Sequence, residues 1–182
     1  MMSTVQVVDY DARWPDTYDA LRRTVWSAIS DVALTVEHVG STSVPGLAAK
    51  PIIDMDVVVP ENSVRIGIAR LAAIGYIHRG DLGVPHREAF HCPANTPKHH
   101  LYLCPVGSDA LRNHLAVRDH LRRHPQVAAA YGALKKALAR SHAHDIDGYV
   151  EAKTDFLIGI LRSAGLSDTS LAEIEQMNRR RV

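Results

Sequence analysis

The feature that most constrains this chain is the run of residues 51–60, in which two carboxylates interrupt a β-branched, apolar segment. The run reads PIIDMDVVVP and is bounded by prolines, which predicts a buried strand. Because side chains alternate across a strand, Asp54 and Asp56 are expected on one face. Two carboxylates held together in apolar surroundings repel each other and destabilise the fold. The pair is therefore expected either to hold a cation or to lie solvated at the end of the strand.

A divalent cation is the partner that best fits this pair. Mg²⁺ is typically bound by one or two carboxylates together with phosphate oxygens of the substrate, and Mn²⁺ accepts the same donors. Upstream, Gly40, Ser41 and Ser43 belong to a loop of small residues whose N–H and hydroxyl groups suit a phosphate. We predict that Asp54 and Asp56 hold Mg²⁺ (or Mn²⁺) and that the loop contacts phosphate. The alternative is an ordinary turn without a ligand.

Composition places the chain among globular proteins of ordinary size. Its 182 residues suffice for one domain, with 46% apolar and 23% charged residues. Lys and Arg number 21 against 20 Asp and Glu, and this net charge of +1 argues against a nucleic-acid partner bound by bulk charge. The start of the chain has no signal-peptide pattern, and no apolar run approaches the roughly 20 residues of a membrane span. We expect a cytoplasmic protein with one domain over residues 1–182 and no membrane segment.

Apolar spacing predicts strands and helices mixed in the first two thirds of the chain, and helices alone afterwards. Strands are expected over residues 5–8, 34–39, 51–60, 76–78, 89–91 and 99–106, and helices over residues 14–29 and 64–74. From about residue 108 the pattern is helical, with starts at Ser108 or Asp109 and at Pro125, one long helix that includes residues 149–161, and a marginal helix after residue 167. The expected fold class is α+β, a small mixed sheet backed by helices with a helical C-terminal part.

The Gly-Ser loop and the acidic strand together resemble a known family. A Gly-Ser turn followed by a strand bearing Asp-x-Asp is similar to the signature of the polymerase-beta-like nucleotidyltransferase superfamily. More closely, EHVGSTSVPGL at residues 37–47 and KPIID at residues 50–54 resemble the GrpB family, which also occurs as a domain fused to dephospho-CoA kinase. The likeness runs from about residue 7 to about residue 165. It implies a nucleotidyltransferase-like fold with Asp54 and Asp56 at the metal positions and Gly40 and Ser41 at the nucleotide phosphates.

Two departures from the superfamily pattern bear on catalysis. The segment between Ser41 and Asp54 is longer than is typical, and active transferases usually carry a third carboxylate on a neighbouring strand. The expected counterpart strand, residues 99–104, has no acid, and instead His100 and Tyr102 share one face. His100 can act as a third ligand or as a general base, because imidazole titrates near neutral pH. Loss of catalysis is the other possibility, and both stay open at this point.

Arg118 is the preferred basic candidate for the triphosphate. It lies beside the apolar stripe of its predicted helix, where a guanidinium needs a carboxylate or a phosphate partner. A structural ion pair is the alternative. Lys50 is also assigned to phosphate, with simple solvation as the alternative. Lys135 and Lys153 are further candidates that either bind the triphosphate or form structural ion pairs.

Other familiar site patterns do not fit. The cluster of His91, Cys92, His99, His100 and Cys104 lacks the close paired spacing of zinc sites. Lys50 is followed by proline rather than by Ser or Thr, so the loop is not a P-loop.

The leading hypothesis is a Mg²⁺-dependent nucleotidyltransferase-like protein that acts on a nucleoside triphosphate and a small-molecule acceptor. Asp54, Asp56 and His100 are the expected catalytic residues, and the nucleotide is expected to contact Gly40, Ser41, Ser43, Lys50 and Arg118. The alternative is a catalytically silent module that binds a nucleotide or a CoA-like ligand and supports a partner enzyme such as dephospho-CoA kinase. The missing third acid favours the silent module, and the retention of both aspartates favours catalysis.

Overall fold

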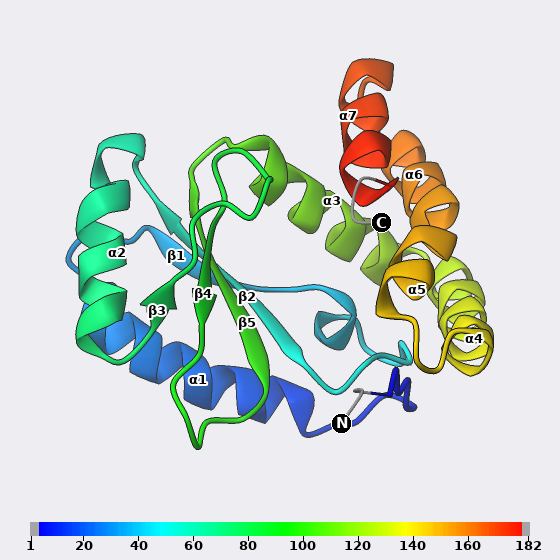
Figure 1. Cartoon of the computed structure of the whole chain (residues 1–182), viewed down its shortest axis with the longest axis horizontal. Coiled ribbons are helices and arrows are strands. Elements are labelled where there is room, and N and C mark those ends of the chain that lie inside the picture. The colour runs from blue at the N-terminus through cyan, green and yellow to red at the C-terminus, as the bar shows by residue number, and fades with distance from the viewer. Residues whose placement is uncertain (1–3, 180–182) are drawn as a thin grey trace.

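The computed structural model describes residues 4–179. Figure 1 shows a mixed sheet with helices on both faces and a cluster of helices at one end. In chain order, the elements are α1 (Trp14–Ile29), β1 (Thr35–Val39), a 3-10 turn (Ser41–Ser43), β2 (Ile53–Val59), a second 3-10 turn (Glu61–Ser63), α2 (Val64–Ala73), β3 (Ile77–His78), β4 (Glu88–His91), β5 (His99–Pro105), α3 (Asp109–Arg123), α4 (Pro125–Ser141), α5 (Ile146–Ala152), α6 (Thr154–Ser163) and α7 (Asp168–Arg179).

The sheet is mixed, with the strand order β1-β2-β5-β4-β3. Only β2 and β5 pair in parallel, and the other neighbours are antiparallel. The acidic strand β2 lies between two partner strands, and helices cover both faces of the sheet, which explains its near-continuous apolar sequence. The prediction of an α+β fold with a small mixed sheet is confirmed.

One face of the sheet packs against α1 and α2 and forms the main hydrophobic core. From β2 this core takes the odd-numbered residues, and β5 contributes Leu101 and Leu103. Because strand side chains alternate, the even-numbered residues of both strands face the other way, toward α3. There Val58 and Cys104 pack against Leu111 of α3. Asp54, Asp56, His100 and Tyr102 share this second face.

The helices α4 to α7 lie together at one end of the sheet, beyond the loop that follows β1 (Figure 1). A second apolar cluster joins this loop to them: Val44 and Leu47 pack with Leu121 of α3, Tyr131 of α4 and Ile160 of α6. The long loop is thereby held between the sheet and the helical end.

Two predicted elements differ from the structure. Residues 5–8 form no full strand, because only Val8 pairs, in an isolated bridge with Ala49. The long helix expected around residues 149–161 is two helices, α5 and α6, which meet at Lys153. There the Thr154 hydroxyl donates to the carbonyl of Val150 at 3.2 Å, a side-chain bond that competes with the regular helix ladder.

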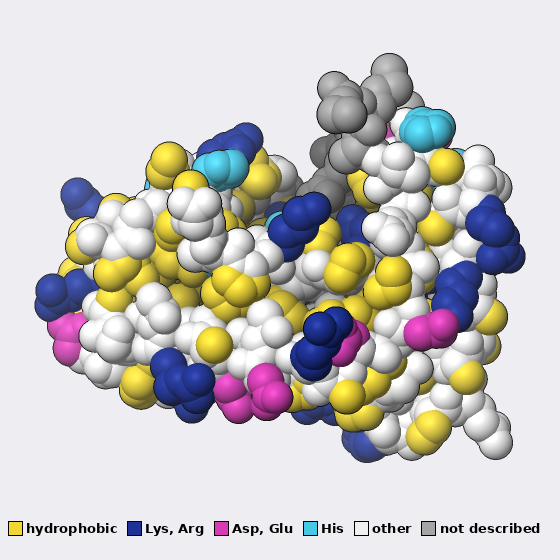
Figure 2. Space-filling model, turned by 90° about the horizontal axis from the view of Figure 1, so that it is seen from below, with side chains coloured by type: hydrophobic (Ala, Val, Ile, Leu, Met, Phe, Trp, Pro, Cys, Tyr) yellow, Lys and Arg dark blue, Asp and Glu magenta, His cyan; other side chains and the backbone are white. Residues whose placement is uncertain are grey.

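Charged side chains are dispersed over the face that Figure 2 draws. Lys and Arg of the described residues lie scattered on it, several beside Asp or Glu. A continuous basic surface, of the kind that binds nucleic acid by bulk charge, is not formed by the described residues on this face. In residues 4–179, none of the helices is both long enough and apolar enough to cross a membrane.

Candidate functional site

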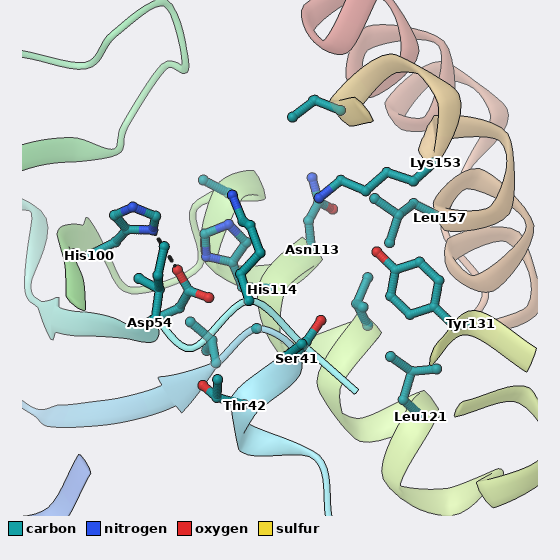
Figure 3. A pocket seen from close by; sticks show the side chains of 18 of the residues that line it. Ser41, Thr42, Asp54, His100, Asn113, His114, Leu121, Tyr131, Lys153 and Leu157 are labelled. Carbon is teal, nitrogen blue, oxygen red and sulfur yellow. Dashed lines mark hydrogen bonds and ion pairs between the residues drawn. The ribbon is translucent and has the colours of Figure 1, made fainter. Parts of the chain in front are cut away.

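The register of β2 against β5 places an acid and a histidine side by side. Asp54 is opposite His100, and the His100 Nδ1 lies 2.8 Å from the Asp54 Oδ1 (Figure 3). A carboxylate only accepts hydrogen bonds, so Nδ1 carries the proton in this contact. In the neutral imidazole the lone pair is then on Nε2. The His100 side chain is 47% exposed, so this nitrogen has room to meet a ligand.

Asp56 forms a second acid–histidine pair deeper in the fold. Its side chain is fully buried, and the Oδ2 accepts a hydrogen bond from Nδ1 of His114 on α3 at 2.8 Å. Burial acts to lower the pKa of His114, but attraction to Asp56 and this hydrogen bond outweigh burial, so the pKa lies above its ordinary value. The other oxygen, Oδ1, is buried without a hydrogen-bond partner among the described residues.

Gly40 brings the loop against Asp54. Its backbone has φ +68°, and a Cβ at this position would lie 2.2 Å from the Asp54 Oδ2. Only glycine allows so close an approach together with a positive φ. The 3-10 turn Ser41–Ser43 follows directly and carries Ser41 beside the acidic strand.

Lys135 of α4 reaches this turn from the helical side. Its side chain is almost completely buried, and Nζ donates to the Ser41 Oγ at 2.7 Å. The ammonium lies 4.5 Å from the centre of the Tyr131 ring, and no ion pair of the described residues involves it. Burial, and next to it the charge of Lys153, lower the pKa of Lys135 to about 7. A buried amine without an anion is a ready partner for a phosphate.

Two arginines of α3 bind β1 and the loop that follows it. Arg118 donates to Glu37 at 2.8 Å and to Asp119 at 2.7 Å, and Arg122 donates twice to the carbonyl oxygen of Ser43, at 3.0 and 2.8 Å. The Ser43 hydroxyl itself donates to the carbonyl of Gly40 at 2.6 Å. Arg118 thus ties α3 to β1, and Arg122 and the Ser43 hydroxyl fix the course of the loop that follows.

A pocket of about 380 Å³ lies between the acidic strand and the helical end, within the usual size range of small-molecule sites. In Figure 3, Asp54, His100 and Ser41 approach it from the sheet side, and Tyr131 and Lys153 approach it from the helices. Of the residues predicted from sequence, Gly40, Ser41, Lys50, Asp54 and His100 line the pocket. Asp56 lies beneath it, bonded to His114, which does line it.

Two predicted phosphate ligands are not brought to the pocket. Ser43 and Arg118 are absent from its lining and make the internal bonds described above. For Arg118 the structure thus contains the ion pair that the sequence left as the alternative. The pairing with Glu37 spans 81 positions of the sequence, so no local spacing could have indicated it.

The donor set at Asp54 and Asp56 fits a divalent cation. The unpartnered Asp56 Oδ1 is a buried acceptor that a cation would satisfy, and two carboxylates match the number that Mg²⁺ commonly takes from a protein. Among residues 4–179, no cluster of three or more His, Cys, Asp or Glu side chains suits a metal ion. Any such cation would therefore need further ligands from outside the chain, such as phosphate oxygens of a substrate.

The sequence does not predict a role for His114 or Arg87, and it predicts Lys135 only as a secondary candidate for phosphate binding. All three line the pocket. His114 and Lys135 come from helices whose apolar spacing says which face is buried but not which strand or loop that face meets. The sequence feature that could have indicated His114 and Lys135 is their position near the apolar stripe of their helices, where a charged side chain needs a partner.

Comparison with known proteins identifies the family. The sequence profile of the family described as GrpB protein matches residues 4–163. The chain belongs to the GrpB family. A UPF0157 protein of Streptomyces coelicolor is 40% identical over 160 residues, which cover 86% of this chain and 82% of that protein. The UPF0157 protein YqkA of Bacillus subtilis is 33% identical, and the match covers 84% of this GrpB-family chain but only 45% of YqkA.

Part of a much longer protein also matches this GrpB-family chain. A dephospho-CoA kinase of Mycolicibacterium paratuberculosis is 27% identical over an alignment 187 residues long, which covers 88% of this chain and 46% of that protein.

Solved structures confirm the fold. The crystal structure of conserved protein GrpB from Enterococcus faecalis has a TM-score of 0.78 and 35% identity, covering 87% of this chain and 96% of that one. The GLD-2/RNP-8 complex matches with a TM-score of 0.52 at 16% identity, over 90% of this chain and 64% of that one. The Cid1 poly(U) polymerase matches with a TM-score of 0.50 at 15% identity, over 74% and 42%. The GrpB fold of this chain is therefore nucleotidyltransferase-like.

Proposed function

We propose that this GrpB-family protein is a nucleotidyltransferase that uses a Mg²⁺-bound nucleoside triphosphate and a small-molecule acceptor. The observation that carries the proposal is the joint position of Asp54 and Asp56 on one face of β2, under a glycine-serine loop that contacts a buried lysine. Asp54, the loop and Lys135 line one pocket of metabolite size, and Asp56 lies beneath it, bonded to His114, which also lines the pocket. The fold shared with the Cid1 poly(U) polymerase agrees with this chemistry.

In this proposal one group of residues binds the metal ion and another group binds the triphosphate. Asp54 and Asp56 hold Mg²⁺ or Mn²⁺, which when bound neutralises phosphate charge and orients the reacting groups. The N–H groups after Gly40, the Ser41 hydroxyl, Lys50 and Lys135 bind the triphosphate.

His100 is the proposed general base. Its Nδ1–H is bonded to Asp54, which leaves the Nε2 lone pair to take the proton of the acceptor hydroxyl. The acceptor oxygen then forms a bond to the α-phosphorus, and the bond from that phosphorus to the oxygen bridging the β-phosphorus breaks. Pyrophosphate leaves with the electron pair of the broken bond. The imidazole of His100 thus supplies what a third carboxylate usually supplies in this superfamily.

The test is turnover with labelled substrate. The purified protein is incubated with Mg²⁺, a mixture of small metabolites and, in turn, ATP, GTP, CTP or UTP labelled on the α-phosphate. The proposal predicts pyrophosphate and one labelled acceptor with a single nucleotide, and loss of both products in Asp54→Asn.

Binding without turnover would contradict the enzyme and support the silent module, which the missing third carboxylate also favours. Binding of a CoA-like ligand in place of every nucleoside triphosphate would overturn the choice of substrate.

A further inference from the structure

Arg87 is a buried cation for which the proposed chemistry gives no role. It lies at the end of the loop before β4 and is only 8% exposed. Its Nε is buried without a hydrogen-bond partner among the described residues. The ion pairs of residues 4–179 do not include it, since Asp56 bonds His114 and Glu88 bonds His78. A buried guanidinium in this state destabilises the protein unless an anion binds it.

The guanidinium is held in place by an aromatic ring. Its carbon lies 4.4 Å from the centre of the Tyr102 ring, a cation–π contact that uses no N–H donor, and the Nε–H still lacks a hydrogen-bond partner among the described residues. Tyr102 is opposite Asp56 in the register of β2 and β5. Both Arg87 and Tyr102 line the pocket that contains Asp54 and His100. The charge of Arg87 also acts on His114, which confirms that it lies close to the deeper acid–histidine pair.

Arg87 and the lysines are associated with different parts of the pocket. Lys135 contacts Ser41 next to Gly40, and Gly40 packs against Asp54. Arg87 instead lies at the level of Asp56, two residues further along β2. In phosphoryl transfer the attacking and leaving oxygens lie roughly in line, on opposite sides of the phosphorus. A triphosphate bound by Lys135 therefore leaves the Arg87 end of the pocket for the acceptor.

We propose that Arg87 binds an anionic group, a carboxylate or a phosphate, on the acceptor. This inference rests on the proposed nucleotidyl transfer and specifies its second substrate as an anionic metabolite that carries a hydroxyl group. Arg87 exchanges no proton in the step, and it positions the hydroxyl whose proton passes to His100 as the new bond to phosphorus forms. Guanidinium geometry suits both oxyanions, because each offers two oxygens to adjacent N–H donors.

The test observes Arg87 directly by NMR. The Nε–H resonances of the arginines are recorded in the ¹⁵N-labelled protein, and that of Arg87 is identified by its absence in Arg87→Lys. Inorganic phosphate and acetate are then titrated separately. We expect a saturable shift of the Arg87 resonance with at least one anion, and the anion that binds more tightly identifies the group on the acceptor. Calorimetry with the same anion should give roughly 10-fold weaker binding in Arg87→Gln.

Two control variants separate this site from the lysines. Arg79→Gln removes an exposed arginine at the start of the same loop and should leave anion binding unchanged. Lys135→Met should leave the Arg87 response intact. An Arg87 resonance that no anion shifts, or a response that disappears in Lys135→Met, would overturn the inference.

The response of the Arg87 resonance to an anion is measured without nucleotide, so it tests the acceptor site separately from nucleotide binding. If nucleotides bind while Arg87 does not respond, the acceptor inference fails and the proposed function stands. If Arg87 responds and no nucleotide binds, the proposed nucleotidyl transfer fails instead.

Discussion

Lys135 combines deep burial with a position at the phosphate loop. The exposed fraction of this residue is 2%, and its amine contacts the Ser41 hydroxyl. Burial lowers its pKa to about 7, so at neutral pH the amine carries only part of its charge. A bound phosphate favours the ammonium form and would restore the charge.

Nucleotide binding should therefore be linked to proton uptake by Lys135. Above pH 7 the free protein must take up a proton as the phosphate binds, so affinity should fall as pH rises from about 7 to 9. Calorimetry at pH 8 in two buffers of different ionisation enthalpy measures this uptake. Lys135→Met should abolish it and weaken binding roughly 10-fold. The neighbouring Lys136 gives the control, since its partly exposed side chain pairs with Asp9 and does not line the pocket, so Lys136→Met should bind as the wild type does.

The same pKa predicts how stability depends on pH. Unfolded lysine titrates near 10.4, so between about pH 7 and 10 the unfolded chain binds more protons at Lys135 than the folded chain. The contribution of Lys135 to the free energy of unfolding should rise with pH across this window. Thermal melting should show a smaller rise in Lys135→Met than in the wild type, and the variant should be the more stable protein at pH 7. Equal pH profiles would contradict the assigned pKa.

Gly40 and Gly46 allow the effect of backbone strain to be separated from contact with Asp54. Both have positive φ, but a Cβ meets Asp54 only at Gly40 and meets nothing within 4 Å at Gly46. Alanine at Gly46 should destabilise the protein by about 1 kcal/mol, because a backbone with positive φ is strained for alanine, and alanine at Gly40 should cost more because its Cβ also clashes with Asp54. Only Gly40→Ala should displace Asp54 and abolish Mg²⁺-dependent nucleotide binding. Equal binding in the two variants would show that the contact with Asp54 has no functional role.

At the scale of elements, the sequence predicts strands and helices better than it predicts their contacts. The alternation in β2 and β5 correctly predicts which residues share a face, because a strand has a fixed period of two. The sequence does not predict the break between α5 and α6 at Lys153, because the residues on either side have helical spacing and the Thr154 hydroxyl bond found at the break is a local contact without a sequence pattern of its own. Residues 5–8 have a strand-like sequence, but only Val8 pairs, in an isolated bridge with Ala49. The sequence therefore predicts a strand that is not formed, because a ladder also needs a partner strand.

The long loop between β1 and β2 depends on Arg122 of α3. Two hydrogen bonds from its guanidinium to the Ser43 carbonyl hold the loop in place. Removing them in Arg122→Ala should destabilise the protein by about 1–3 kcal/mol and increase hydrogen exchange over residues 40–47. Arg123→Ala is the control, because Arg123 is exposed and bonds a carbonyl of its own helix. Unchanged exchange in Arg122→Ala would show that apolar packing alone holds the loop.

At the scale of the whole molecule, the pocket forms where the sheet meets the helical end. The sheet side supplies Asp54 and His100, and the helices supply Tyr131 (Figure 3). Lys135 of α4 also lines the pocket from the helical side. The sheet side could be predicted because its residues fall within one loop and two strands. The helical side could not, because the partners of Lys135 and His114 lie 94 and 58 positions away in the sequence.

Magnesium-dependent nucleotide binding is the property on which this interpretation depends most. Calorimetry with the α,β-methylene analogues of ATP, GTP, CTP and UTP, in Mg²⁺ and in EDTA, measures it without turnover. We predict that at least one analogue binds in Mg²⁺, and that binding weakens 10-fold or more, by about 1.4 kcal/mol or more, in EDTA and in Asp54→Asn. Asp31→Asn, which removes a half-exposed partner of Arg70, should bind as the wild type does. A folded Asp54→Asn variant that keeps the full Mg²⁺-dependent affinity would contradict the proposed site.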